Sequence, residues 1–177
     1  LKVNAHPHVD CTGEIVVVHN GIIENYADLK NELENKGHTF TSKTDTEVVP
    51  HLIEEILKNN SALTLTMAVQ EAIKKLEGSY ALAIISTKEP SKIICARNES
   101  PLVIGVGDNA MYCASDITAF LPLTNKAVMV NDRELVILTG SNYEIIRLQD
   151  GATITRDPKS IDWTPEMAVK QGYPHFM

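Results

Sequence analysis

Asn20 and Gly21 follow a short apolar run and form a pair suited to holding negative charge. The run from Ile15 to Val18 is rich in β-branched residues and has the length of a strand buried on both faces. We expect the chain to turn at Asn20-Gly21, because this dipeptide tolerates positive φ at little steric cost. The turn would leave a side-chain amide and a backbone N–H at the end of a rigid strand, where they could bind an oxyanion. The alternative is a tight turn between two strands with no further role.

Asp45 is the second candidate and precedes a run of apolar residues at helical spacing. Thr44 and Glu47 have the spacing of a capping box, but Pro50 would remove a hydrogen bond deep in a helix. Regular helix is therefore expected to begin near residue 46 or 47, with Asp45 in the preceding loop. Its carboxylate could satisfy free amide groups at the helix start, or it could bind a substrate ammonium through a charge-assisted hydrogen bond.

The histidines near these candidates do not have the spacing of metal ligands. His6, His8 and His19 lack a nearby carboxylate cluster that would close a site, so we expect no metal there. We interpret them as structural hydrogen-bonding groups beside the site.

The composition is that of one soluble domain. The 177 residues are 44% hydrophobic and 22% charged. A net charge of −7 and the lack of a Lys/Arg cluster argue against a nucleic-acid partner. No apolar run approaches the ~20 residues that span a bilayer, so no membrane contact is expected.

The cysteines indicate a reducing, cytoplasmic location, because there are three and none is in a Cys-x-x-Cys pair. Cys95 and Cys113 lie in apolar runs and are interpreted as small buried hydrophobic residues. Cys11 follows Asp10 in a loop and is expected to be an accessible thiol without special reactivity.

The first half of the chain reads as helices around the candidate residues. The sequence predicts a helix over 26–36 capped by Asn25, a short strand over 38–42, a helix from residue 46 or 47 through Leu57, and a helix over 65–77.

The second half reads as an antiparallel meander of short strands separated by turn residues. A short helical segment capped by Asp116 interrupts it over 117–121. This order predicts an α+β layered domain in which helices cover sheet faces. The predicted strands are 80–86, 93–97, 102–106, 111–114, 127–130, 135–138, 144–148 and 152–155.

Several ordered segments of the chain resemble the glutaminase domains of glucosamine-6-phosphate synthases. These amidotransferases make glucosamine 6-phosphate from glutamine and fructose 6-phosphate. The resemblance covers essentially the whole chain. The segments are Asn4-Ala5-His6-Pro7-His8, the run from Val16 to Tyr26, Thr44-Asp45-Thr46-Glu47, the run from Ser100 to Gly105, Ala114-Ser115-Asp116, and the run from Tyr173 to Met177.

The resemblance implies a fold and a chemistry. The fold is the layered α/β/β/α sandwich of N-terminal nucleophile hydrolases, with two antiparallel sheets flanked by helices. In this family of class II glutamine amidotransferases, the thiolate of an N-terminal cysteine attacks the side-chain amide of glutamine. By this resemblance Asn20 and Gly21 hold the oxyanion, Gly21 and Asp45 bind the substrate, and Asp45 takes its α-amino group. No cofactor is implied.

The chain departs from the family pattern at its start. It lacks the N-terminal cysteine and the Arg-Trp-Ala-Thr-His-Gly motif that precedes the Asn-Ala-His-Pro-His run in the family, and Leu1 cannot be the nucleophile. We therefore expect residues 1–156 to form an N-terminally incomplete glutaminase domain that is inactive alone. Residues 157–177 are expected to be a tail or linker toward an absent sugar isomerase domain.

The missing first part should expose a sheet edge or an apolar face, which a homodimer could cover. Two alternative functions remain open. One is the glutaminase domain of another class II amidotransferase, such as the purine-pathway or asparagine-synthesising enzymes. The other is a non-catalytic binding or assembly module that has kept the fold.

Overall fold

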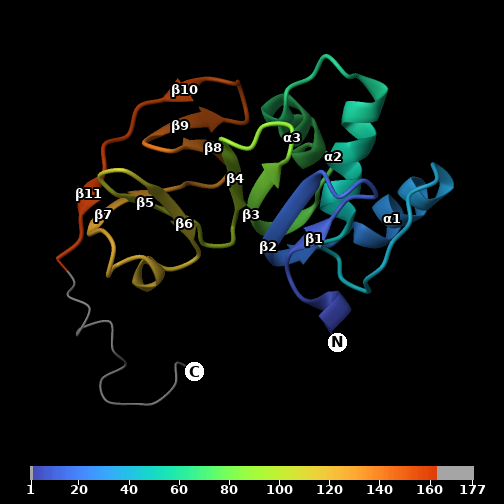
Figure 1. Ribbon diagram of the computed structural model, residues 1–177, viewed down its shortest axis with the longest axis horizontal. Coiled ribbons are helices and arrows are strands. Elements are labelled where there is room, and N and C mark those ends of the chain that lie inside the picture. The colour runs from blue at the N-terminus through green and yellow to red at the C-terminus, as the bar shows by residue number, and fades with distance from the viewer. Residues whose placement is uncertain (1, 163–177) are drawn as a thin grey trace.

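The computed structural model describes residues 2–162, which form two antiparallel sheets and three α-helices (Figure 1). One sheet has the strand order β1-β2-β3-β4-β8-β9-β10, and the other has the order β11-β7-β5-β6. The helices are α1 (Tyr26–Asn35), α2 (Val48–Asn59) and α3 (Leu65–Ile73), with 3-10 turns η1 (Lys2–Asn4) and η2 (Ile117–Ala119). The strands are β1 (His8–Val9), β2 (Ile15–Ile23), β3 (Gly78–Ser86), β4 (Ile93–Asn98), β5 (Val103–Val106), β6 (Met111–Ala114), β7 (Lys126–Met129), β8 (Glu134–Thr139), β9 (Asn142–Arg147), β10 (Thr153–Ile154) and β11 (Lys159–Ser160).

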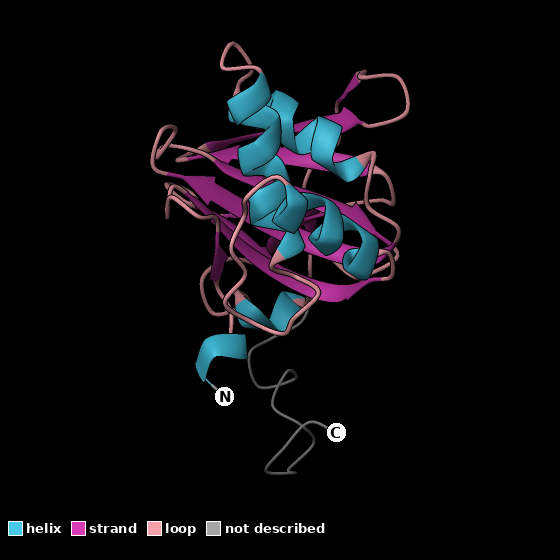
Figure 2. Ribbon diagram, turned by 90° about the vertical axis from the view of Figure 1, so that its right-hand side faces the viewer, coloured by secondary structure: helices cyan, strands magenta, loops and turns pink. Residues whose placement is uncertain are grey.

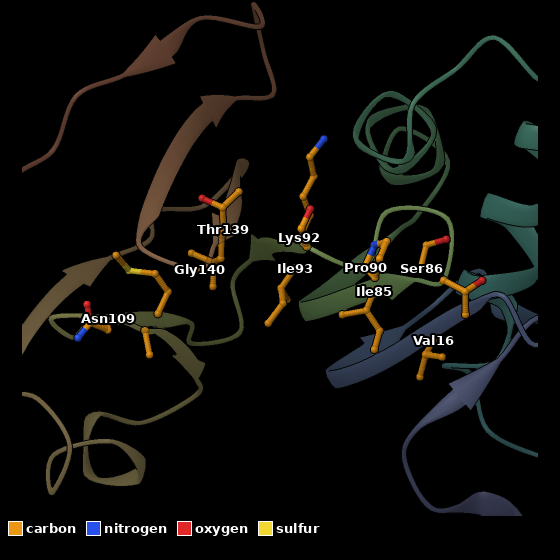
Figure 3. Close-up of a pocket in the computed structure, with 14 residues that line it drawn as sticks. Val16, Ile85, Ser86, Pro90, Lys92, Ile93, Asn109, Thr139 and Gly140 are labelled. Carbon is orange, nitrogen blue, oxygen red and sulfur yellow. The ribbon is translucent and has the colours of Figure 1, made fainter.

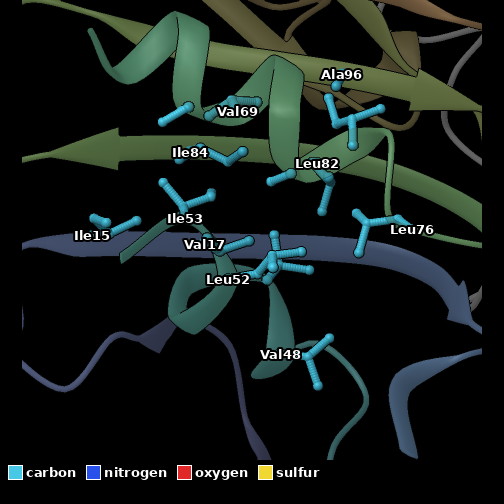
Figure 4. Packing of buried hydrophobic residues seen from close by; sticks show 14 of the residues in the cluster. Ile15, Val17, Val48, Leu52, Ile53, Val69, Leu76, Leu82, Ile84 and Ala96 are labelled. Carbon is cyan, nitrogen blue, oxygen red and sulfur yellow. The ribbon is translucent and has the colours of Figure 1, made fainter. Parts of the chain in front are cut away.

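The helices pack on one face of the seven-stranded sheet (Figure 2). Their apolar residues, such as Leu52, Ile53 and Val69, meet Val17 and Leu82 of β2 and β3 in the main core (Figure 4). A second core lies between the two sheets and contains Cys95, Ile104, Val128, Val136 and Ile145. This arrangement confirms the predicted α+β sandwich of antiparallel sheets. The outer face of the small sheet carries η2 and Ile161, and Phe120 beside η2 packs on Val103 and Ala127.

Strand β2 continues through Asn20 and Gly21, so the predicted turn at this dipeptide is wrong. The strand pairs with β3 along its whole length, from Ile15 opposite Ser86 to Ile23 opposite Gly78. The nine-residue pairing outweighs the local turn preference of Asn-Gly. Gly21 is nevertheless required by the backbone, because its φ is +141° and a Cβ there would lie 2.1 Å from the carbonyl oxygen of Ser79.

The prediction that β2 is buried on both faces is also wrong. Ile15 and Val17 face the helices and are buried, whereas Val18 on the opposite face is 42% exposed. Val9 and Ile85 on the neighbouring strands are exposed as well. An apolar strip of β1, β2 and β3 thus lies open on the side away from the helices.

Three local predictions differ from the structure because side chains, rather than strand or cap patterns, hold the backbone. Residues 38–42 form no strand, since the N–H groups of Thr41 and Ser42 bind the Glu47 carboxylate. Because its carboxylate binds these two N–H groups, Glu47 does not form the capping box that its spacing from Thr44 suggested. Asn25 does not cap α1, because its side chain bonds the Lys75 carbonyl and the Glu77 N–H beyond α3.

A fourth, non-local prediction also differs from the structure: the strands predicted as one meander divide between two sheets.

The folded region reaches beyond the predicted boundary at residue 156. Strand β11 pairs with β7, and Ile161 packs against the core around Phe120. Residues 163–177, the rest of the predicted tail, lie outside the described residues. Among residues 2–162, no helix has both the length and the apolar character that crossing a membrane requires.

Glu134 and Arg156 form an ion pair that ties the segment after β10 to β8. The Arg156 guanidinium donates to both oxygens of the buried Glu134 carboxylate, at 2.6 and 2.7 Å. Burial would raise the pKa of Glu134, but the hydrogen bonds from Arg156 and Asn131 outweigh it, and the pKa is lowered. A carboxylate whose pKa is lower folded than unfolded adds stability above the unfolded value of 4.5, and this contribution is lost as pH falls through the folded pKa.

Glu134→Gln is expected to lower the free energy of unfolding by about 2 kcal/mol near pH 7, because charge-assisted hydrogen bonds in a buried site are lost. Urea unfolding at several pH values measures the change. The deficit should shrink as pH falls below the unfolded pKa. Glu71→Gln, which removes an exposed pair with Lys74, is the matched control and should change stability by less than about 0.5 kcal/mol. An equal loss of unfolding free energy in Glu134→Gln and Glu71→Gln would refute the stabilising role of the buried Glu134–Arg156 pair.

Candidate functional site

Asn20 lies in a hollow between the two sheets. The hollow has a volume of about 190 Å³, and Val18 and Asn20 of β2 line it together with Leu102, Cys113 and Ser115. The even-numbered residues of β2 point to this side, because side chains alternate along a strand. The Asn20 amide therefore faces a cavity large enough for a small polar group.

The N–H of Gly21 points to the open edge of β2. Backbone N–H groups two residues apart leave a strand on the same edge. On β2, the N–H of the odd-numbered Ile15 donates to the Asp10 side chain beside β1. The N–H of the even-numbered Glu24, just after β2, donates to the Glu77 carbonyl on the β3 side. The N–H of the odd-numbered Gly21 therefore lies on the β1 side. Strand β1 pairs only with residues 16 and 17 of β2, so it ends before Gly21. The Gly21 N–H is thus left beyond the end of β1.

Asp45 lies at this same edge. Its Oδ2 accepts the N–H of Ile23 at 2.7 Å, and Ile23 is two residues beyond Gly21. This contact fixes the carboxylate beside the open edge of β2. The structure therefore brings Asp45 and Gly21 to one strand edge, and Asn20 lies next to Gly21 with its side chain on the sheet face. Asp45 does not line the hollow that contains Asn20.

Two histidines hold the loop of Asp45 in place. The ring nitrogen Nδ1 of His19 lies 2.9 Å from the hydroxyl of Thr46, and Nε2 of His8 lies 3.2 Å from the hydroxyl of Thr44. Burial lowers the pKa of both histidines. These contacts give His8 and His19 the structural hydrogen bonds that were expected of them.

Glu47 secures the start of α2 behind Asp45. Burial would raise its pKa, but hydrogen bonds from the hydroxyl and N–H groups of Ser42 and Thr41 outweigh it and lower the pKa to about 2. The ionised carboxylate therefore acts as a fixed acceptor between residues 41–42 and the helix.

Sequence reasoning gave no role to some residues near the site. The hydroxyl oxygen of Ser100 lies 2.9 Å from the point where a Gly21 Cβ would stand, and Cys113 lines the Asn20 hollow. Ser100 begins a segment that resembles the glutaminase family, and this resemblance could have indicated that Ser100 lies near the site. Nothing local in the sequence relates Cys113 to Asn20, because their strands belong to different sheets.

A larger hollow of about 710 Å³ lies farther along the same side of the large sheet (Figure 3). Val16, Ile85 and Ile93 give it an apolar wall, and Asn109 closes it from the β5–β6 hairpin. Among the described residues that line it, Lys92 is the only charged one. Within residues 2–162 the lining brings no carboxylate, histidine or cysteine to this hollow, so it is a weaker candidate than the Asn20 site.

The chain is similar to known proteins over most of its length. The glutamine amidotransferase domain family matches residues 2–122. The chain belongs to this family. It is 53% identical over 175 residues to the glutamine–fructose-6-phosphate aminotransferase (isomerizing) of Thermococcus kodakarensis, covering 99% of this chain and 29% of that protein. The protein of the same name from Methanothermobacter thermautotrophicus is 50% identical over 98% of this chain and 29% of its own length.

Solved structures confirm the fold of the amidotransferase domain. The glutamine phosphoribosylpyrophosphate amidotransferase of B. subtilis superposes with a TM-score of 0.68 and 29% identity, over 82% of this chain and 32% of that one. The domain thus has the N-terminal nucleophile hydrolase fold that the resemblance implied. The amidotransferase domain spans less than a third of the length of each of these three proteins.

Proposed function

We propose that the amidotransferase domain hydrolyses glutamine and supplies ammonia within a glutamine–fructose-6-phosphate aminotransferase. The observation that carries the proposal is the gathering of Asn20, Gly21 and Asp45 at one end of β2. An amide and a backbone N–H suit an oxyanion, and a carboxylate suits an ammonium group. Relatives about half identical in sequence carry the name of that aminotransferase.

The proposed reaction follows from these groups. A thiolate attacks the side-chain carbonyl carbon of glutamine, and the carbonyl electrons move onto oxygen to form a tetrahedral oxyanion. The Asn20 amide and the Gly21 N–H stabilise that oxyanion, while Asp45 holds the α-ammonium. As the oxyanion collapses, the amide nitrogen takes a proton from the α-amino group of the N-terminal cysteine and leaves as ammonia. The thioester that remains is hydrolysed by water to glutamate and free thiol. The ammonia would pass to fructose 6-phosphate on a sugar isomerase domain, the proposed partner.

The attacking thiol is proposed to be an N-terminal cysteine upstream of residue 1, so residues 1–177 alone are proposed to be inactive. Cys95 is fully buried, and Cys11 lies on the helix side of β2 near His38 and His51. Cys113 is the one competitor, because it lines the hollow with Asn20.

The test compares glutamate release by residues 1–177 with release by the same chain joined to an upstream segment that begins with cysteine. We expect activity only in the longer protein, and Cys113→Ser should leave that activity unchanged. Hydrolysis by residues 1–177 that disappears in Cys113→Ser would overturn the proposed nucleophile. If the longer, folded protein never releases glutamate, the non-catalytic binding module would be the better account.

Asp45→Asn in the longer protein is expected to raise KM for glutamine roughly 10–100-fold with little change in kcat, because one charge-assisted hydrogen bond to the ammonium is lost. Asparagine can still accept the Ile23 N–H, so the loop should keep its position. Asp28→Asn on the exposed face of α1 is the control. A large fall in kcat at unchanged KM would show that Asp45 serves the reacting atoms instead.

Two further expectations remain predictions. A homodimer would cover the exposed apolar strip of Val9, Val18 and Ile85, and light scattering would detect it. A cytoplasmic location is proposed because the reaction uses soluble metabolites and free thiols.

A further inference from the structure

Cys11, His38, His51 and Glu54 gather on the helix side of the molecule, away from the proposed glutamine site. One ligand atom from each lies within 4.8 Å of the other three. They come from three separate segments, namely the β1–β2 loop, the stretch after α1, and α2, and these segments are packed side by side (Figure 1). We propose that these four residues form a structural site for a zinc-type divalent cation.

Four of the six distances between the ligand atoms are close to those expected around one ion. Around tetrahedral zinc, with Zn–S near 2.3 Å and Zn–N or Zn–O near 2.0–2.1 Å, neighbouring ligand atoms stand roughly 3.3–3.6 Å apart. Here Cys11 Sγ is 3.5 Å from His51 Nδ1 and 3.7 Å from His38 Nδ1. Glu54 Oε2 is 3.1 Å from His38 Nδ1 and 3.4 Å from His51 Nδ1.

The outer nitrogens of the two rings face carboxylates, as in carboxylate–histidine–metal arrangements. His38 Nε2 lies 3.1 Å from Glu55 Oε2, and His51 Nε2 lies 3.7 Å from Glu47 Oε1. The Thr39 N–H donates to Cys11 Sγ at 3.4 Å. Glu54 Oε2 also accepts the Cys11 N–H at 3.0 Å, so His38, Cys11 and Glu54 each have a second hydrogen-bond partner. The Nε2 of His51 faces Glu47 at a distance longer than a hydrogen bond.

A hydrogen-bond network without a cation satisfies these groups poorly. A neutral imidazole has one N–H, yet His38 has carboxylate oxygens 3.1 Å from both of its nitrogens. His51 is 1% exposed, and its Nε2 has no hydrogen-bond partner within 3.5 Å in residues 2–162. A neutral His38 therefore cannot donate to both carboxylates, and the His51 ring lies beside it, with ring centroids 5.4 Å apart. One divalent cation bound to both Nδ1 lone pairs removes the conflict and leaves each Nε2–H directed at a carboxylate.

The donor set selects the class of metal. A thiolate with two imidazoles favours zinc over magnesium or calcium, which prefer oxygen ligands. The thiolate and the Glu54 carboxylate balance the charge of a divalent ion. Four protein ligands leave no open position for substrate, so the site links the loops around α2 and has no catalytic role.

Cobalt titration of tag-free, metal-depleted protein tests the site. We expect one equivalent of Co²⁺ to give the intense visible bands of a tetrahedral ion and a near-ultraviolet thiolate-to-cobalt band, both abolished by Zn²⁺. Zinc at a hundred-fold excess over its dissociation constant should raise Tm by roughly 5–10 °C, whereas Mg²⁺ should not. Absence of the thiolate band in the unsubstituted protein would overturn the proposal without any variant.

Variants then locate the ligands. Cys11→Ser should lose the thiolate band and His51→Gln should lose most of the Co²⁺ affinity, each in protein with an unchanged circular dichroism spectrum. Cys113→Ser and His6→Gln are the matched controls and should bind as the unsubstituted protein does. Loss of the band in Cys113→Ser, or its retention in Cys11→Ser, would place the metal elsewhere and refute the assignment. None of these readouts depends on glutamine hydrolysis.

Discussion

Asn20→Ala, in the longer protein with its N-terminal cysteine, is expected to lower kcat for glutamine hydrolysis by roughly 10²–10³-fold with little change in KM. The Asn20 amide faces the hollow, and its contact with the substrate oxygen strengthens only when that oxygen becomes negative. Steady-state glutamate release measures both constants.

Asn109→Ala is the matched control, because it removes an asparagine side chain from the larger hollow of Figure 3. We expect kcat and KM to stay within about two-fold of the unsubstituted protein. A large effect of Asn109→Ala combined with a small effect of Asn20→Ala would move the active site to that hollow. A rise in KM alone on Asn20→Ala would mean that Asn20 binds the ground state of the substrate.

Gly21→Ala is expected to destabilise the fold by roughly 3 kcal/mol or more and to abolish activity. The new Cβ would lie 2.1 Å from the Ser79 carbonyl oxygen, a backbone atom of the paired strand that cannot move away cheaply. The φ of +141° adds a conformational cost for any residue with a Cβ. Urea unfolding measures the loss.

Alanine substitutions at two other glycines distinguish the effect of the Cβ contact from the effect of the positive φ. Gly151 has φ of +72° with open space around its Cβ position, so Gly151→Ala should cost only about 1 kcal/mol. Gly140 has open space and no such φ, so Gly140→Ala should be nearly neutral. If Gly21→Ala were as stable as Gly140→Ala, the close contact between the Gly21 backbone and the Ser79 carbonyl would be refuted.

Helices and strands were predicted from the sequence more accurately than the pairing of the strands into sheets. Helices α1, α2 and α3 and most strands follow from hydrophobic period and turn residues, which are local. The division of β4, β5 and β8 between two sheets does not, because strand pairing is decided by packing between distant segments. The same limit explains Asn20-Gly21, where pairing with β3 outweighed a local turn preference.

The candidate site was predictable only in part. Asn20, Gly21 and Asp45 were found from residue type, position and family resemblance, and the structure places them at one strand end. The cluster of Cys11, His38, His51 and Glu54 was missed, because its spacing along the chain resembles no metal motif. Only His51 and Glu54 are near neighbours in sequence, and the fold supplies the other two from loops.

We propose that glutamine is hydrolysed at the end of β2, and a crystal structure of the longer protein with bound glutamate tests this proposal. We expect a side-chain carboxylate oxygen of glutamate within hydrogen-bonding distance of the Asn20 amide and the Gly21 N–H. We expect the α-ammonium within about 3 Å of Asp45. Glutamate bound in the larger hollow beside Ile85 and Asn109, or with its ammonium far from Asp45, would refute the proposed site.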